Sequence, residues 1–431
     1  MSAAIRYATP SGWNQIATPG RARSQSLGRD IRVRFAIVGA GFAGHAIARR
    51  LSELFPADEI ALFDALPRGE GAAGRSSGFM LSRADSKIDV RGSAAEVRWG
   101  TAILRAGKET LRKIVDHHNI SCDWRDIGHY KTASTDAGAK ALDALLTSLS
   151  AKGVRGRSLS QADIVAQLGC TRYTHAIWLP DCTLVQPAEL INGLLDTLPS
   201  QVGFYENTPI MRLIPGTPNR VTSERHTVQA DTVIFSNNAS LPFFGYGRSR
   251  QLNVYTYGAL TPPLDAGELD KLGQETDWGA TPAESLGPST RKLNSGRLLF
   301  RAGFSYKSEL PPAQIKDLLR TLYRQYYPAM QVHEFEHVWG GALSMSRNGM
   351  PIFGKLDKNV YGLSACNASG ILKMTALGGL LAEDIAGMDS PLLRETKQFA
   401  RPQWMPPEPI RRIAVHMQMA RMKRAMDQRP G

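Results

Sequence analysis

The sequence contains little cysteine, little charge and no long apolar run. Its four cysteines are scattered through 431 residues without a CxxC pair, which predicts neither a disulfide framework nor a zinc ribbon. Hydrophobic residues make up 42% and charged residues 21%, as is typical of a globular protein. The longest apolar stretch, residues 35–48, is too short to span a bilayer, and the first thirty residues have no apolar signal core. We therefore expect a cytoplasmic protein with reduced thiols.

The formal charge of +13 is concentrated at the two ends. Residues 1–34 hold six arginines against one acidic residue, and residues 391–431 hold nine basic against three acidic residues. The body has no basic face with interleaved aromatic residues, so nucleic acid is not an expected partner. We also predict no metal site, and we find no basis for hydrolytic or phosphoryl-transfer chemistry.

The last residues predict a basic, methionine-rich amphipathic helix over 407–427. Its expected apolar stripe is Ile410, Ile413, Met417 and Ala420. We expect this stripe to pack on the core or on another subunit. Contact with a membrane surface is the alternative. The oligomeric state is not predicted.

Residues 31–64 follow the order of a dinucleotide-binding unit. The apolar run 31–38 predicts a buried parallel strand, and a GxGxxG motif follows at 39–44. Apolar residues at helical spacing predict a helix over 45–55, and residues 59–64 predict a second strand that ends in an acid. Strand, glycine loop, helix, strand and acid in this order predict a bound dinucleotide.

Each residue of the motif has a physical task. Gly39 permits the tight turn, Gly41 lets the backbone approach a pyrophosphate, and Gly44 allows close helix–strand packing. Phe42 and Ala43 complete the loop before the helix, whose N-terminus offers free N–H groups to phosphate, and both are predicted to bind the dinucleotide. Asp64 can accept hydrogen bonds from ribose hydroxyls, which argues against a 2′-phosphate and hence against NADP.

A second loop rich in glycine and serine, residues 65–80, follows the acid directly. A simple NAD domain does not need it. Here the chain resembles the D-amino-acid-oxidase-like (DAO) family of FAD-dependent oxidoreductases, whose members carry GASGRNSGF where this chain has GAAGRSSGF, with Ser76 in place of Asn. The resemblance implies that FAD is the cofactor and that this loop binds it through Ala65, Arg75, Ser76, Ser77, Gly78 and Phe79.

The resemblance continues over roughly residues 11–430 and is closest to the branch that includes gamma-glutamylputrescine-oxidase-like proteins. Residues 204–213, 231–240, 337–356 and 360–387 are similar to the family's later cofactor segments. It implies further FAD-binding residues at Ile210, Asn238, Gly340, Asn367, Gly370, Ile371, Leu372 and Lys373. We expect a small buried thiol at Cys366 rather than covalent flavin attachment.

The implied fold is α/β in two domains, a Rossmann-like FAD-binding domain and an antiparallel-sheet substrate domain, as in the glutathione-reductase-like and DAO folds. We expect the FAD-binding domain at 35–95, 165–245 and 340–390, and the substrate domain at 96–164 and 246–339. Residues 1–34 and 391–431 are expected to be basic extensions.

In the family, the second sheet shapes the substrate cavity. Strand alternation places Tyr255 and Tyr257 on one face, and both are catalytic-site candidates with Arg301, Trp339 and His129. Arg301 is a charged residue in an apolar strand, which is costly unless it is paired. It can hold a carboxylate, the flavin or an internal salt bridge.

The resemblance implies oxidation of a C–N bond in an amine or amino acid by hydride transfer to flavin N5, after which the imine hydrolyses. Dioxygen is the expected electron acceptor. Two alternatives remain: a dehydrogenase that passes electrons to a quinone or carrier, and a flavin-binding partner subunit without turnover.

Overall fold

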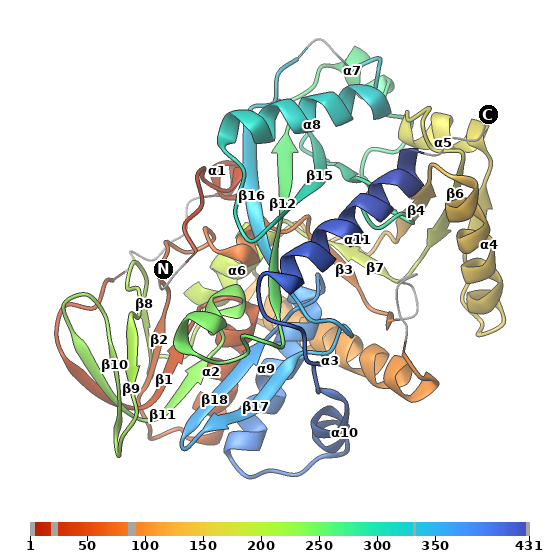
Figure 1. The fold of residues 1–431 in the computed structure, drawn as a ribbon. Helices are drawn as coiled ribbons and strands as arrows, with labels where there is room; N and C mark the ends of the chain where they lie inside the picture. Colours follow the sequence, from red (N-terminus) through yellow and green to blue (C-terminus); the bar gives the residue numbers. More distant parts are fainter. Residues whose placement is uncertain (1–4, 19–24, 85–91, 331–332, 428–431) are drawn as a thin grey trace.

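The computed structural model describes residues 5–18, 25–84, 92–330 and 333–427. Of its two large β-sheets, the first lies at the lower left in Figure 1 and the second runs from the middle of the molecule to its right side. The chain passes repeatedly between the sheets, so each is built from distant segments. The fold is the two-domain α/β arrangement expected from the sequence.

The first sheet has the core order β17-β18-β11-β1-β2-β8, with strands β17 (Ile352–Asp357), β18 (Val360–Ser364), β11 (Thr227–Phe235), β1 (Ile31–Val38), β2 (Ile60–Phe63) and β8 (Val202–Tyr205). All neighbours are parallel except β17 and β18. β9 (Arg212–Ile214) and β10 (Asn219–Thr222) add an antiparallel extension to β11. β1 and β2 are the two strands predicted around the glycine motif.

Apolar helix faces cover this sheet. The core against it includes residues of α2 (Phe42–Leu54), α3 (Ala94–His118), α6 (Pro187–Asp196) and α9 (Gly370–Ile385). α10 (Pro391–Phe399) packs on α3 and α9. Each helix buries an apolar stripe, which is why these segments assemble around one sheet.

The second sheet has the order β16-β12-β15-β14-β13-β4-β6-β5. Its strands are β16 (His337–Met345), β12 (Leu252–Leu260), β15 (Leu298–Tyr306), β14 (Ser289–Lys292), β13 (Trp278–Pro282), β4 (His129–Ala133), β6 (His175–Leu179) and β5 (Arg157–Leu159). α8 (Pro312–Tyr326) packs on β12, β15 and β16 (Figure 1). α4 (Asp136–Ser150) and α5 (Gln161–Leu168) pack against β6.

Short elements complete the described fold: α1 (Gly12–Ile16), the 3-10 turns η1 (Ala72–Arg75) and η3 (Asn238–Phe244), α7 (Ala266–Asp270), and the ribbon of β3 (Phe79–Leu81) with β7 (Cys182–Leu184). Among the described residues, no helix combines the length and apolar character needed to cross a membrane.

The observed packing divides the chain differently from the expected domain boundaries in three places. α3 belongs to the core of the first sheet although it falls in the segment expected to form the substrate domain. β6 and all of β16 pair in the second sheet, although 165–245 and 340–390 were expected in the FAD-binding domain. Part of the expected N-terminal extension is packed, because Trp13 is buried. Packing and strand pairing between distant segments decide to which domain these residues belong, and local composition does not reveal such contacts.

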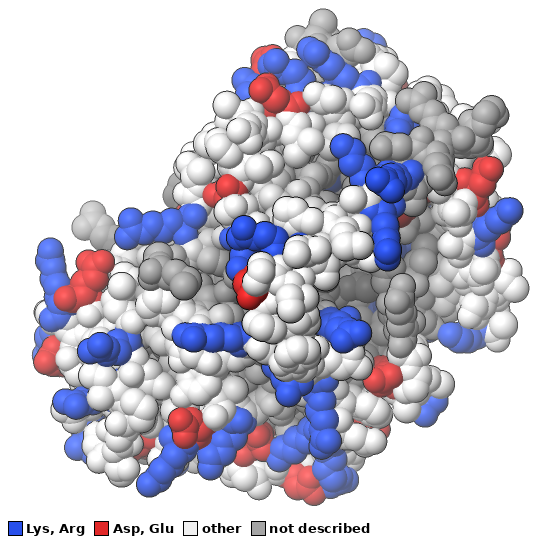
Figure 2. All heavy atoms as spheres, viewed as in Figure 1, with Lys and Arg blue, Asp and Glu red and all other residues white. Residues whose placement is uncertain are grey.

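The C-terminal helix α11 (Ile410–Asp427) forms, but its expected apolar stripe faces outward. Ile410 and Ile413 are 59% exposed and Met417 is 53% exposed, so this stripe does not pack on the core of its own chain. Packing on another subunit, which was expected as the other possibility, stays a prediction. The partly buried side instead contains Arg411, Val415, Met419 and Met422. On the face that carries α11, Lys and Arg outnumber Asp and Glu but are spread over the surface (Figure 2).

Candidate active site

Residues from both sheets line a cavity of about 410 Å³. Most residues predicted to bind the cofactor meet there. They are Gly39, Gly41, Phe42, Ala43, Asp64, Ala65, Arg75, Ser76, Ser77, Gly78, Phe79, Ile210, Asn238, Gly370, Ile371 and Leu372. The two glycine-containing loops and the later segments are thus one site, although more than 300 residues separate its ends.

The glycine motif has the geometry that its sequence predicts. Gly39 has φ +107°, and a Cβ on Gly44 would lie 1.8 Å from the Gly39 carbonyl oxygen. A Cβ on Gly41 would meet nothing closer than Ala73 at 3.8 Å. Gly44 therefore serves helix packing, whereas Gly41 leaves open space at the start of α2.

Two helices begin at the cavity without side-chain caps. The N-cap residue of α2 is Gly41, which has no side chain to cap the helix, and Ser369 at the start of α9 forms no side-chain cap hydrogen bond. In the turn before α9, Ala365, Asn367 and Ala368 all have positive φ, a strained arrangement for residues other than glycine. Both helix ends direct free N–H groups and positive dipole ends at the cavity, so it suits a ligand with negative charge.

Asp64 lies at the end of β2, where a ribose would be recognised. Its carboxylate accepts from Ala40 N at 2.9 Å and from Leu66 N at 3.0 Å. Burial raises the pKa of Asp64, and these N–H groups oppose the shift. The backbone bonds orient the carboxylate at the cavity wall.

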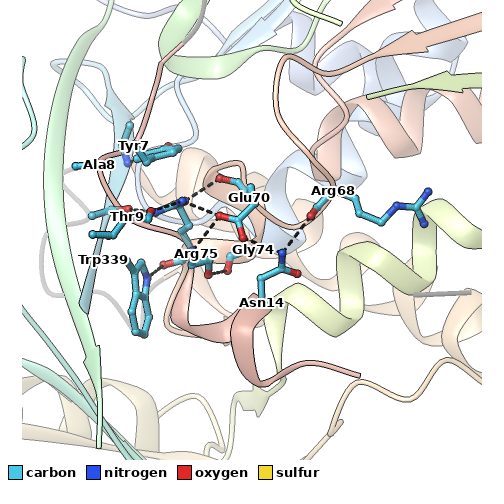
Figure 3. Close-up of polar contacts among 12 residues, drawn as sticks. Tyr7, Ala8, Thr9, Asn14, Arg68, Glu70, Gly74, Arg75 and Trp339 are labelled. Carbon is cyan, nitrogen blue, oxygen red and sulfur yellow. Dashed lines mark hydrogen bonds and ion pairs between the residues drawn. The ribbon is translucent and has the colours of Figure 1, made fainter. Parts of the chain in front are cut away.

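Arg75 lies in the glycine- and serine-rich loop, but protein groups occupy most of its donors (Figure 3). Its guanidinium donates to the Glu70 carbonyl at 2.7 Å, the Gly340 carbonyl at 3.0 Å, and the Thr9 carbonyl and Glu70 carboxylate at 2.8 Å each. Burial lowers the pKa of Arg75. Arg75 therefore connects segments of the chain and lines the cavity, so its side chain is not a free phosphate ligand.

Four predicted cofactor residues do not line the cavity. Gly44 packs against β1, and Gly340 holds Arg75 through its carbonyl oxygen. The Asn367 carboxamide accepts from Ser346 N at 2.8 Å and donates to backbone carbonyls, so it braces the turn before α9. Lys373 is half-buried within α9, outside the lining.

Arg301 lines the cavity from the second sheet. Its guanidinium lies over the Phe304 ring, with the central carbon 4.7 Å from the ring centroid. No hydrogen bond or ion pair to its guanidinium is formed within the described ranges, so an internal salt bridge is not the explanation for this arginine. Burial alone lowers the pKa of Arg301 to about 10, which leaves it charged at neutral pH.

The pairing register determines which residues share the face of Arg301. Arg301 lies opposite Gly258, and a bulge at Gly303 brings Phe304 opposite Thr256. Residues directly opposite point to the same side, so this face carries Thr256 and Gly258. Tyr255 and Tyr257 share the other face and pack in the core that includes α8 residues.

The remaining catalytic candidates lie in packed surroundings. Tyr257 touches the cavity lining, but Tyr255, Trp339 and His129 do not. Trp339 is buried against the N-terminal segment, and its indole N–H donates to the Arg75 carbonyl at 3.2 Å. His129 lies inside β4, where burial lowers its pKa to about 3.

Several lining residues were not singled out from the sequence. Ile5 and Tyr7 come from the N-terminal segment, and Thr256 and Ser289 share the face of Arg301. Gly258 lies opposite Arg301, but the Trp339 ring fills the space beside it, since a Cβ on Gly258 would lie 2.8 Å from that ring. Arg291 was also missed; its buried guanidinium donates to the carbonyls of Ser77 at 3.1 Å and Val185 at 2.7 Å and so fixes the loop.

Two five-residue strings match hydrolase signatures by their letters alone. Residues 333–337 read HEFEH and residues 74–78 read GRSSG. The first is not helical and runs into β16, and His333 bonds to Glu268 at 2.8 Å. The second follows a 3-10 turn and not a strand-to-helix elbow. Within the described ranges, no group of three His, Cys, Asp or Glu residues could hold a metal ion.

Comparison with known proteins shows the family of the chain. Residues 34–384 match the DAO family model, described as FAD dependent oxidoreductase. The chain belongs to the DAO family. Gamma-glutamylputrescine oxidoreductase of Escherichia coli strain K12 is 23% identical over 372 residues, which cover 84% of this chain and 85% of that protein. The probable oxidoreductase OrdL of Haemophilus influenzae is 22% identical and covers 83% of each chain.

Solved structures confirm the DAO fold. Glycine oxidase from Geobacillus kaustophilus matches with a TM-score of 0.70 at 18% identity, over 84% of this chain and 96% of that one. L-proline dehydrogenase from P. horikoshii matches with a TM-score of 0.67 at 13% identity, over 86% of this chain and all of that one.

The residues present fit FAD, the cofactor of this family. Open space at Gly41 and the uncapped start of α2 suit the pyrophosphate of FAD. The uncapped start of α9 offers the positive end of its helix dipole to a second part of FAD that carries negative charge. Asn237 Oδ1, Thr256 Oγ1 and Thr281 Oγ1 are buried without hydrogen-bond partners, and all three residues line the cavity. Unmet polar atoms in a buried wall suit a large polar ligand.

Proposed function

We propose that this DAO-family enzyme oxidises the C–N bond of an amine that also carries a carboxylate, with dioxygen as the electron acceptor. The observation that carries the proposal is Arg301, a cation in the cavity wall without an ion pair in the described chain. Arg301 is half-buried, an unpaired charge in such a wall is costly, and a carboxylate is a group that a guanidinium binds strongly.

The relatives support this substrate class. Their printed names include gamma-glutamylputrescine oxidoreductase, glycine oxidase and L-amino acid deaminase. A γ-glutamyl amine, glycine and an L-amino acid each contain a carboxylate as well as an amine. Arg301 gives this chain a residue of its own with which to bind such a group.

The protein residues would orient the substrate rather than act as a strong base. When FAD is bound, it accepts the hydride released from the C–H beside the amine nitrogen. Arg301 would fix the carboxylate, while Thr256 and Ser289 on the same face supply hydroxyls. The apolar walls would exclude water and favour the neutral amine, whose lone pair the reaction needs.

An anaerobic absorption experiment tests the proposal. The purified protein should show flavin bands that bleach on addition of an amine, and an amino acid should bleach them far better than its own amide. The amide is the matched control because it replaces the carboxylate with a neutral group of similar shape, and its less basic amine would by itself favour bleaching. Equal bleaching by both would refute the carboxylate assignment, and bleaching by no amine would refute the oxidation itself. Rapid recolouring in air identifies an oxidase, whereas slow recolouring that a quinone accelerates identifies a dehydrogenase.

A further inference from the structure

Residues 5–16, which we call the N-terminal strap, lie along the free edge of β16, before the segment that matches the family. β16 is an outer strand of its sheet, so alternate backbone groups have no strand partner. The Thr9 hydroxyl donates to the Val338 carbonyl at 2.8 Å, and Ala342 N donates to the Tyr7 hydroxyl at 3.4 Å. Side chains of the strap thus form hydrogen bonds with two backbone groups of this edge, in the place where another strand would pair.

The same strap is bonded to the loop that lines the cofactor cavity (Figure 3). The Ser11 hydroxyl donates to the Gly74 carbonyl at 2.7 Å, and Ser11 N donates to the Glu70 carboxylate at 2.9 Å. Arg75 donates to the Thr9 carbonyl. Strap, loop and β16 are therefore joined at Arg75, which also bonds to Gly340 in β16.

Tyr7 connects this network to the cavity. Its ring lies over the Arg75 guanidinium, with the central carbon 3.9 Å from the ring centroid, and Tyr7 and Ile5 both line the cavity. Burial raises the pKa of the Tyr7 hydroxyl, so it stays neutral. An aromatic face over a guanidinium that already has four hydrogen bonds fixes the orientation of Arg75.

We propose that the N-terminal strap is part of the FAD site. Tyr7 and Thr9 are positioning residues that hold Arg75, and through it the loop of residues 69–79, in the shape that receives the cofactor. Tyr7 and Ile5 also close one wall of the cavity. This inference rests on the FAD dependence of the family and not on the proposed substrate.

Cofactor affinity tests the inference without turnover. Apoprotein is titrated with FAD, and binding is followed by the change in flavin fluorescence. Tyr7→Ala should weaken FAD binding by about tenfold, the size expected for loss of a partly desolvated cation–π contact. Tyr7→Phe keeps the ring and should stay within about threefold of the wild type. Deletion of residues 1–9 removes both positioning residues and should weaken binding further, by about 30-fold or more.

Tyr306→Ala is the matched control, because Tyr306 is also a half-buried tyrosine with one hydroxyl contact, to Glu408, but lies outside the lining. Its FAD affinity should equal that of the wild type.

The visible circular dichroism of bound flavin is a second measurement, since a strap that only stabilises the fold would leave this signal unchanged. Wild-type affinity and an unchanged spectrum in Tyr7→Ala would overturn the inference, even if the variant melts at a lower temperature. Because wild-type protein that binds FAD but is bleached by no amine refutes only the proposed function, the two failures are distinguishable.

Discussion

At the scale of single residues, the unpaired cation of Arg301 is the most informative feature. The structure places it in the cavity wall beside Phe304, where burial depresses its pKa. A charged group kept there without a protein partner costs stability, and this cost is offset when an anion binds. The charge of Arg301 therefore favours the binding of an anionic substrate but lowers the stability of the protein without substrate.

We expect Arg301→Leu to raise KM for a carboxylate-bearing amine by about 10- to 100-fold, the size of a lost charge-assisted hydrogen bond. The same variant should melt no lower than the wild type as apoprotein, because it removes a half-buried charge that has no ion pair in the described chain. Steady-state kinetics with an amino acid test the predicted change in KM, and thermal melts of the apoprotein test the predicted stability. Arg301→Lys should restore part of the loss in KM, and a KM unchanged in Arg301→Leu would show that this arginine does not bind substrate.

The glycine motif offers a paired prediction, because Gly41 and Gly44 have different surroundings. Gly44→Ala should destabilise the protein by about 3 kcal/mol, since its Cβ would lie 1.8 Å from the Gly39 carbonyl oxygen in a packed interface. Gly41→Ala should fold normally, because its Cβ points into open space, yet lose FAD affinity. Chemical denaturation and FAD titration of both variants check this. Equal effects on stability would contradict the assigned roles.

At the scale of elements, α11 is a loosely attached helix. Its apolar residues Ile410, Ile413 and Met417 are exposed, and α11 contributes no cavity residue. The contacts of this terminal region include a hydrogen bond from Arg411 to the Gln251 carbonyl at 3.3 Å and ring packing of His416 on Tyr306.

Truncation after Pro409 should therefore leave FAD content and the visible spectrum of the flavin unchanged, with a decrease in melting temperature of only a few degrees. Absorption spectra and thermal melts of the truncated protein check this expectation. Loss of flavin on truncation would show that α11 supports the cavity. Size-exclusion chromatography of both proteins tests whether the exposed stripe joins subunits.

At the scale of the whole molecule, two buried histidines link stability to pH. Burial lowers the pKa of His45 and of His129 to about 3, so both are neutral in the folded protein. The unfolded chain binds these protons near pH 6.5. Stability therefore falls as pH decreases from about 6.5 toward 3, by up to about 1.4 kcal/mol per pH unit for each histidine.

We expect His129→Leu to flatten this dependence between about pH 6 and pH 4. Denaturant unfolding at several pH values measures the slope. His416→Leu is the control, because His416 is exposed on α11 and its replacement should leave the slope as in the wild type. A slope that is the same in His129→Leu and the wild type would contradict a neutral buried His129.

The cofactor half of the site was more predictable than the substrate half. Gly39, Gly41, Asp64 and the loop around Ser76 lie close together in sequence, and each has a task that its residue type defines. Tyr255 was placed correctly on the face of Tyr257, but of the two only Tyr257 touches the cavity lining, because alternation groups residues on a face without saying which of them reach the cavity. Tyr7 was missed because nothing local ties an N-terminal segment to a loop some sixty residues later.

The sequence by itself determined the dinucleotide unit, since strand, glycine turn, helix and acid are contiguous and their geometry depends on local sterics. It also determined the family, because the later cofactor segments follow in a fixed order. Only the tertiary structure decided the cavity face of the second sheet, where the register between β12 and β15 and the bulge at Gly303 place Arg301 beside Thr256. It also decided the role of Arg75, whose partners come from the strap, its own loop and β16. These properties depend on pairing between segments far apart in the chain, which local patterns do not record.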